Sequence, residues 1–163
     1  MPARPPPSEE GGDPPCWAHL FSDEGVDDAT LATFVRRAAD AVVISDRDGR
    51  ITFWNEAAER VFGWPATIAC GQSLDLIIPE RQRARHWDGF HQAVARGTTR
   101  YGDQLLQVPA VHRDGGIISI AFTVTLLIDG EERLDGIVAV IRDETDARRQ
   151  RLELERKVAS QSG

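Results

Sequence analysis

The sequence predicts an α+β domain in which a five-stranded antiparallel sheet carries helices on one face. Two stretches point to this fold. Residues 41–63 run as an apolar segment, a turn, a second strand-like segment and a short helix. After a long helical segment, residues 99–142 form three strand-like runs that are separated by glycine-containing turns. The expected element order is therefore ββαααβββ, with an additional helix flanking each end.

The first hairpin and its helix are predicted from turn and capping residues. Ala41–Ser45 is an apolar run, Ile51–Trp54 is β-branched and aromatic, and Gly49 between them supplies the positive φ of a turn. Asn55 can then cap a helix, and Gly63 ends it. The apolar positions of that helix are Ala57, Ala58, Val61 and Phe62.

The second half of the domain opens with the longest expected helix. It covers Glu80–Arg96, because Pro79 precedes it and Gly97 closes it. Pro109 in the next strand predicts a position at a sheet edge, since proline cannot donate a ladder hydrogen bond. The other elements expected around the helix are short helical segments at 65–69 and 73–77 and strands at 99–111, Ile117–Ile128 and 134–142.

The two ends of the chain differ in composition from its middle. Residues 1–15 are polar and rich in proline, so we expect them to be disordered, and a short apolar patch follows at 16–21. A flanking helix is predicted at 29–39 and a charged helix at 146–160. The chain is therefore divided into a disordered tail at 1–27, a domain at 28–145 and a C-terminal signalling or linker helix at 146–163.

Composition limits the classes of function. The 163 residues carry a net charge of −7, which argues against nucleic acid as a partner. No apolar run is long enough to span a bilayer, and the polar N-terminus does not have the pattern of a signal peptide. Cys16 and Cys70 lack the spacing of a metal or redox motif, so two inert thiols in a reduced cytoplasm are expected. No catalytic triad or phosphate-binding loop is visible in the sequence, and we expect no enzyme.

Residues 44–71 carry a series of turn, cap and helix residues that resembles the PAS family of sensory domains. The matching residues are Ile44, Asp46, Asp48, Gly49, Ile51, Asn55, Ala57, Ala58, Gly63 and Gly71. The resemblance covers about residues 35–145. It implies the PAS fold and a function in signal transduction, in which the domain holds a small ligand or a partner and passes the change to a neighbouring helix.

Residues 83–90 resemble the long helix of the FixL-type haem-binding PAS oxygen sensors. His86 shares a helical face with Phe90, and its spacing to Gly97 equals the spacing from the haem-ligating His to the helix-ending Gly in those sensors. The resemblance implies haem b with His86 as the iron ligand. When the two sequences are counted from the His without gaps, those sensors carry a basic residue where this chain has Leu106. The other pocket residues that we expect are Trp87, Phe90, Leu106 and Phe122.

A flavin is the alternative cofactor. PAS domains of the LOV class carry a photoactive Cys where this chain has Leu74, and Cys70 lies several residues away. Covalent flavin photochemistry is therefore not expected, whereas non-covalent FAD or FMN stays open. Its stacking residues would be Trp54, Trp64 and Trp87, aromatic side chains whose other role is core packing.

Asp143 and Thr145 match the Asp-x-Thr sequence with which PAS domains often join their output helix. Both are candidate signal-coupling residues, since Asp143 can cap or form an ion pair and Thr145 can cap the helix that follows. The resemblance also implies a homodimer and a signalling partner such as a kinase or another effector. A ligand-free module for dimerisation or adaptor function is the alternative. The predicted dimer contact is an apolar stripe of Leu31, Phe34, Val35 and Ala38.

Overall fold

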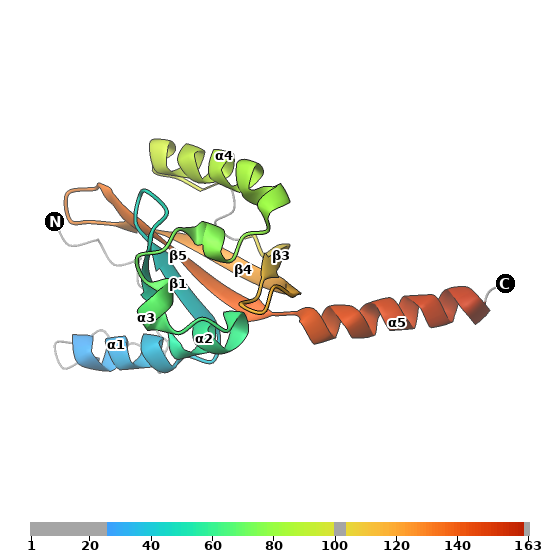
Figure 1. Cartoon of the computed structure of the whole chain (residues 1–163). Coiled ribbons are helices and arrows are strands. Elements are labelled where there is room, and N and C mark those ends of the chain that lie inside the picture. The colour runs from blue at the N-terminus through green and yellow to red at the C-terminus, as the bar shows by residue number, and fades with distance from the viewer. Residues whose placement is uncertain (1–25, 100–103, 162–163) are drawn as a thin grey trace, which may run out of the picture. The chain divides into compact units, whose positions relative to one another are not determined.

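The structure, a computed structural model, describes residues 26–99 and 104–161 (Figure 1). The chain divides into two units, residues 1–33 and 34–163, and the described strands all belong to the second. In chain order the elements are α1 (Asp28–Arg37), β1 (Ala41–Ser45), β2 (Ile51–Trp54), α2 (Glu56–Phe62), α3 (Ala66–Ala69), the 3₁₀ helix η2 (Leu74–Leu76), α4 (Glu80–Arg96), β3 (Leu106–Val111), β4 (Ile117–Ile128), β5 (Leu134–Asp143) and α5 (Thr145–Gln161).

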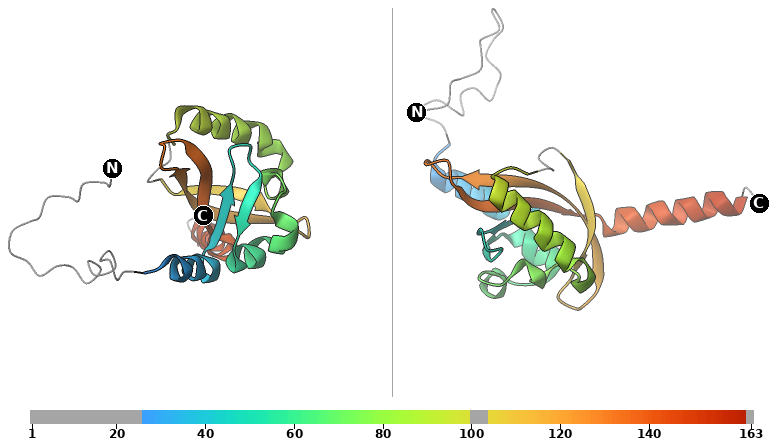
Figure 2. Two further views of the ribbon diagram at one scale, coloured as in Figure 1. Left: turned by 90° about the vertical axis from the view of Figure 1, so that its left-hand side faces the viewer. Right: turned by 90° about the horizontal axis from the view of Figure 1, so that it is seen from above.

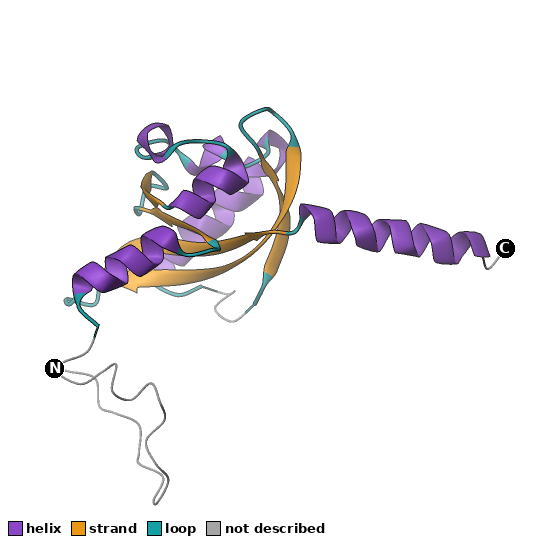
Figure 3. Cartoon of the chain, turned by 90° about the horizontal axis from the view of Figure 1, so that it is seen from below, coloured by secondary structure: helices purple, strands orange, loops and turns teal. Residues whose placement is uncertain are grey.

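The strands form one antiparallel sheet in the order β2-β1-β5-β4-β3. The first strand of the domain therefore lies beside the last one, with Val43 of β1 opposite Ala139 of β5. Figure 3 shows the twisted strands in orange. Strand β3 is at an edge, which confirms the position predicted from Pro109. The predicted α+β fold with a five-stranded antiparallel sheet is confirmed.

The hydrophobic core lies between the sheet and the helices on one of its faces (Figure 2). Ala57, Ala58 and Phe62 of α2 are at most 1% exposed. The ring of Phe62 lies 5.2 Å from that of Trp54, which is 4% exposed at the end of β2. Burial of one such aromatic side chain contributes about 1.5–3 kcal/mol to stability. The packing of its buried side chains therefore contributes more to the stability of the short helix α2 than its length does.

The ends of α2 are set by the two residues that the sequence indicated. The Asn55 side chain accepts a hydrogen bond from the Ala58 N–H, as an N-cap does. Gly63 ends the helix with a φ of 78°, a conformation that glycine adopts without strain. A Cβ at Gly63 would lie 2.5 Å from Nε2 of His112, so the close approach of the β3–β4 turn also requires glycine there.

Asn55 also ties the start of the domain together. Its side chain is 1% exposed, and Oδ1 accepts from the Val42 N–H at 2.9 Å as well as from Ala58. Nδ2 donates to the carbonyl oxygens of Val35 and Asp40, each at 3.1 Å. One buried amide thus holds the end of α1, the start of β1 and the start of α2.

Two predicted boundaries need correction. The edge strand begins at Leu106 and not at residue 99, because Leu106 is the first residue that stands opposite an apolar partner, Phe122 of β4, whereas Leu105 before it is 60% exposed. The first helix ends at Arg37 and not at residue 39. The carbonyl of Val35, which would accept from residue 39 in a longer helix, accepts from Asn55 instead.

Several predictions fall on the chain ends. The disordered tail, the apolar patch at 16–21 and Cys16 lie outside the described residues, whereas Cys70 is an exposed free thiol. In the described part of the chain, no helix has the length and apolar character needed to cross a bilayer. Within residues 26–99 and 104–161 no three His, Cys, Asp or Glu side chains are grouped so that they could hold a metal ion by themselves.

Candidate functional site

The helix α4 presents an aromatic cluster on its inward face. His86 is half-buried, and its ring lies 4.9 Å from that of Trp87 and 5.9 Å from that of Phe90. The Nδ1 atom of His86 is buried and has no hydrogen-bond partner among the residues that the structure describes. A buried polar atom without a partner costs about 1–3 kcal/mol, so this nitrogen is a position at which a ligand would restore a lost interaction.

Burial also sets the charge of His86. It lowers the pKa of the imidazole below its ordinary value of 6.5, because the charged form is poorly solvated there. The nearby carboxylate of Asp75 acts in the opposite direction, and His91 lowers the pKa further. His86 is therefore a neutral imidazole near pH 7, which is the form that binds a metal.

Trp87 fixes α4 against the rest of the domain. Its indole Nε1 donates to Oδ1 of Asp75 in η2 at 2.8 Å, and its ring lies over Gly49 in the β1–β2 turn, where any Cβ would collide with it. Arg83 adds hydrogen bonds to the carbonyl oxygens of Ile78 and Asp75. The side chain next to His86 is therefore an anchor of α4, and Gly49 is required by this packing as well as by its turn.

The remaining predicted pocket residues fall into two groups. Phe90 is 7% exposed and packs with the rings of α4, outside the main core cluster. Leu106 and Phe122 are partners across β3 and β4, and Phe122 packs against the core cluster. The same row continues through Ile141 of β5 to Ala41 of β1. The structure thus places one group on α4 and the other on the sheet.

The aromatic residues considered for flavin lie in different surroundings. Trp54 is in the core and donates from Nε1 to the Trp64 carbonyl at 2.9 Å. The guanidinium of Arg113 lies over the Trp64 ring at 5.3 Å, while Trp87 anchors α4. The three tryptophans therefore form no single stacking surface. Leu74, at the position of the photoactive Cys, is part of η2.

The junction between β5 and α5 is held by β4. The Asp143 side chain accepts from the Thr145 N–H at 2.8 Å and so caps the helix. Thr145 is the first residue of α5, and its hydroxyl accepts from the Ser119 N–H at 3.1 Å instead of capping the helix, which corrects that expectation. The Glu144 N–H donates to the Ser119 carbonyl at 2.8 Å. Both backbone groups of one residue on β4 therefore hold the start of α5.

A second connection at this end was not indicated by the sequence. The Nε and Nη2 atoms of Arg142 donate to the two carboxylate oxygens of Asp40, at 3.0 and 2.7 Å. The guanidinium holds the pKa of Asp40 below its ordinary value. The two residues are 102 positions apart, so no local pattern relates them. They join the residue that precedes β1 to the end of β5.

The family follows from the whole of this arrangement. The model of the PAS fold matches residues 29–143, and the chain belongs to the PAS family. PAS domains are sensory modules and are not catalytic. The chain is therefore a sensory domain of signal transduction, with the strand order and the terminal helices given above.

The curated relatives are larger proteins. An uncharacterized protein of Azorhizobium caulinodans is 32% identical over 132 residues, which cover 80% of this chain and 18% of that protein. The Sensor protein FixL of Bradyrhizobium diazoefficiens is 28% identical over 132 residues, covering 77% of this chain and 25% of FixL. The cell-division control histidine kinase PdhS of Brucella ovis is 27% identical over 124 residues, covering 76% and 12%. The chain spans a quarter or less of these relatives.

Solved structures share the fold. The PAS domain of a protein from Colwellia psychrerythraea has a TM-score of 0.64 at 22% identity and covers 72% of this chain and 97% of that one. An RNA-binding Light-Oxygen-Voltage receptor has a TM-score of 0.66 at 19% identity, covering 98% of this chain and 42% of the receptor. At these identities the likeness concerns the fold alone.

Proposed function

We propose that this chain is a haem-binding sensory module in which His86 would hold the iron of haem b. The observation that carries the proposal is the Nδ1 atom of His86, which is buried and without a hydrogen-bond partner in the described part of the chain. The lowered pKa keeps this imidazole neutral, as an iron ligand must be. The apolar side chains of Phe90 on α4 and of Phe122 and Leu106 on the sheet support the proposal, since haem is held in an apolar pocket.

The residues of the chain would have separate tasks. His86 would hold the iron, and haem, when bound, supplies an iron with a coordination position for a small gas molecule. Trp87 would hold α4 in place through Asp75 and Gly49, which keeps His86 in position. Asp143 and Thr145 would pass a change in the sheet to α5 through Ser119. These hydrogen bonds at the start of α5 are present in the structure and do not depend on the identity of the ligand.

The setting we propose is a cytoplasmic homodimer that signals to a partner such as a kinase or another effector. A sensor protein and a histidine kinase among the relatives support this setting. The net charge of −7 supports a protein partner over nucleic acid. Membrane association is not part of the proposal.

The decisive experiment is the visible spectrum of the purified chain after reconstitution with hemin. We expect a haem band in the wild type and its loss in His86→Ala. The matched control is His91→Ala, an exposed histidine on the same helix, which should keep the band. Unchanged haem content in His86→Ala would mean another axial ligand. A flavin band from the untreated protein would replace haem with non-covalent FAD or FMN.

The second candidate function is a ligand-free dimerisation or adaptor module. The observation in its favour is the exposure of apolar side chains on α1, where Phe34 is 69% and Leu31 50% exposed. Exposed apolar surface of this kind usually marks a contact with a partner. A colourless protein that fails to take up hemin and still dimerises through α1 would favour this function.

A further inference from the structure

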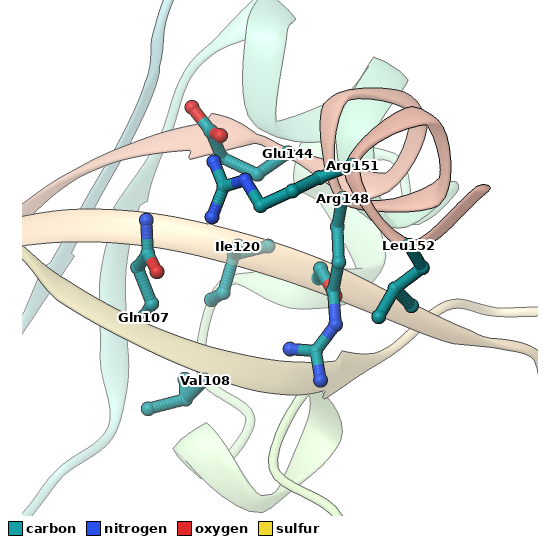
Figure 4. A pocket seen from close by; sticks show the side chains of 8 residues that line it. Gln107, Val108, Ile120, Glu144, Arg148, Arg151 and Leu152 are labelled. Carbon is teal, nitrogen blue, oxygen red and sulfur yellow. The ribbon is translucent and has the colours of Figure 1, made fainter. Parts of the chain in front are cut away.

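A cavity of about 200 Å³ lies where the first turns of α5 pass β3 and β4 (Figure 4). It is separate from the aromatic cluster of α4. It borders the joint at which Asp143 and Thr145 start the output helix, because Glu144 belongs to both. The residues that line it are Gln107, Val108, Ser119, Ile120, Glu144, Arg148, Arg151 and Leu152.

The charges around this cavity are unbalanced. Arg148 and Arg151 carry two guanidinium groups against the single carboxylate of Glu144. Neither guanidinium has a hydrogen bond or ion pair within residues 26–99 and 104–161, whereas their neighbour Arg149 binds Asp146 at 3.1 Å. An arginine presents a fork of donors that matches the geometry of carboxylate and phosphate groups.

The spacing of the two arginines strengthens the case. Arg148 and Arg151 are three residues apart on α5 and so lie on one face of the helix, where like charges destabilise it by about 0.2–0.5 kcal/mol. An anion placed between them would turn this repulsion into two attractive contacts. The Gln107 amide can donate a further hydrogen bond from β3, and Leu152 adds an apolar wall. The cavity has room for several water molecules and therefore for a small organic acid.

We propose that this cavity binds a small-molecule oxyanion, either a carboxylate or a phosphate, between Arg148 and Arg151. The site is independent of the haem proposal, because it shares no residue with the cluster around His86. Its occupation would connect β3 to the first turns of α5. The anion would therefore act as a second input that holds the output helix against the sheet.

The test is a titration of the full chain with sodium phosphate and with sodium citrate, followed by amide NMR at low ionic strength. Sodium chloride at matched ionic strength is the reference. We expect saturable shifts that are confined to the cavity residues and the first turns of α5, with one of the two anions binding more tightly. That preference assigns the site to phosphate or to carboxylate. Equal shifts with chloride, or shifts that do not saturate, overturn the proposal.

The matched variants compare two pairs of arginines on the same helix. Arg148→Gln with Arg151→Gln should weaken binding by about tenfold or more, since charge-assisted hydrogen bonds are lost. Arg149→Gln with Arg156→Gln removes the same charge elsewhere on α5 and should leave the affinity unchanged. Equal weakening in both pairs would reveal a general charge effect and overturn the assigned site. Circular dichroism checks that α5 is intact, and if the first pair fails to fold, the wild-type titration against chloride decides.

Discussion

At the scale of single residues, His86 combines burial with a ring nitrogen that lacks a partner. Because burial lowers the pKa of His86 below that of the unfolded chain, the unfolded state binds a proton more readily as the pH falls. Above about pH 6.5 the imidazole is neutral in the folded and in the unfolded state, so its lowered pKa costs no stability there. Below that pH the folded state loses stability, until the pH also falls below the lowered pKa.

The direction of this pH dependence gives the first prediction. Between about pH 7.5 and about pH 5, the free energy of unfolding should fall less in His86→Phe than in the wild type, because the variant has no proton to bind there. Urea denaturation at the two pH values measures the difference. His91→Phe removes a neighbour that lowers the pKa of His86, so its fall should lie between those of the wild type and His86→Phe. A fall in His86→Phe as large as that of the wild type would show that other groups cause it.

Asn55 carries the second prediction at this scale. Asn55→Ala removes the partners of the Val42 N–H and of the Val35 and Asp40 carbonyls, so we expect a loss of about 3 kcal/mol in the free energy of unfolding. Chemical denaturation measures it. Ser73→Ala removes a cap that makes a single contact, with the Asp75 N–H, and should cost about 1 kcal/mol. Equal losses in the two variants would mean that Asn55 acts only as a helix cap.

At the scale of elements, the sequence predicted what depends on neighbouring residues. Strands β1, β2 and β4 and helix α4 have the predicted bounds, because alternation, turn glycines and flanking Pro79 and Gly97 are local signals. The bounds of β3 and α1 depend on distant partners, Phe122 for the first and Asn55 for the second. Such partners cannot be derived from the local pattern.

The features of the candidate site also divide into those that local sequence signals predict and those that depend on distant partners. Periodicity predicted the inward position of His86 and Phe90 on α4. It could not predict that Trp87 binds Asp75, or that Ser119 would hold the start of α5 from 26 residues away. The salt bridge of Arg142 and the cavity beside Arg148 likewise arise only when strands and helices meet in space.

The start of α5 gives the third prediction. Thr145→Val keeps the shape of the side chain and removes the acceptor of the Ser119 N–H, which should cost about 1 kcal/mol of stability. Amides in the first turn of α5 should then exchange faster with deuterium, which mass spectrometry measures. Thr33→Val is the control, because that hydroxyl binds within the exposed helix α1. Unchanged exchange in α5 would mean that Asp143 and the Ser119 carbonyl, which accepts from the Glu144 N–H, position the helix without the Thr145 hydroxyl.

At the scale of the whole molecule, the prediction concerns assembly. Phe34→Glu places a charge in the apolar stripe of α1, at a cost of several kcal/mol when that charge is buried and unpaired in a dimer. We expect a dimeric wild type and a monomeric, folded variant, as measured by light scattering. Ala32→Glu, an exposed position outside the stripe, should remain dimeric. A monomeric wild type at high concentration, or a dimeric Phe34→Glu, removes α1 as the interface.

The strand order has a consequence for the way the chain is made. β1 leaves the ribosome early, but its central partner β5 follows about 100 residues later, since Ala41 pairs with Ile141. Until then β1 has only β2 beside it, and its other edge stays open to wrong partners. The sheet can be completed only after the last strand has been synthesised. A nascent chain that stops before Leu134 lacks β5, the central strand of the sheet.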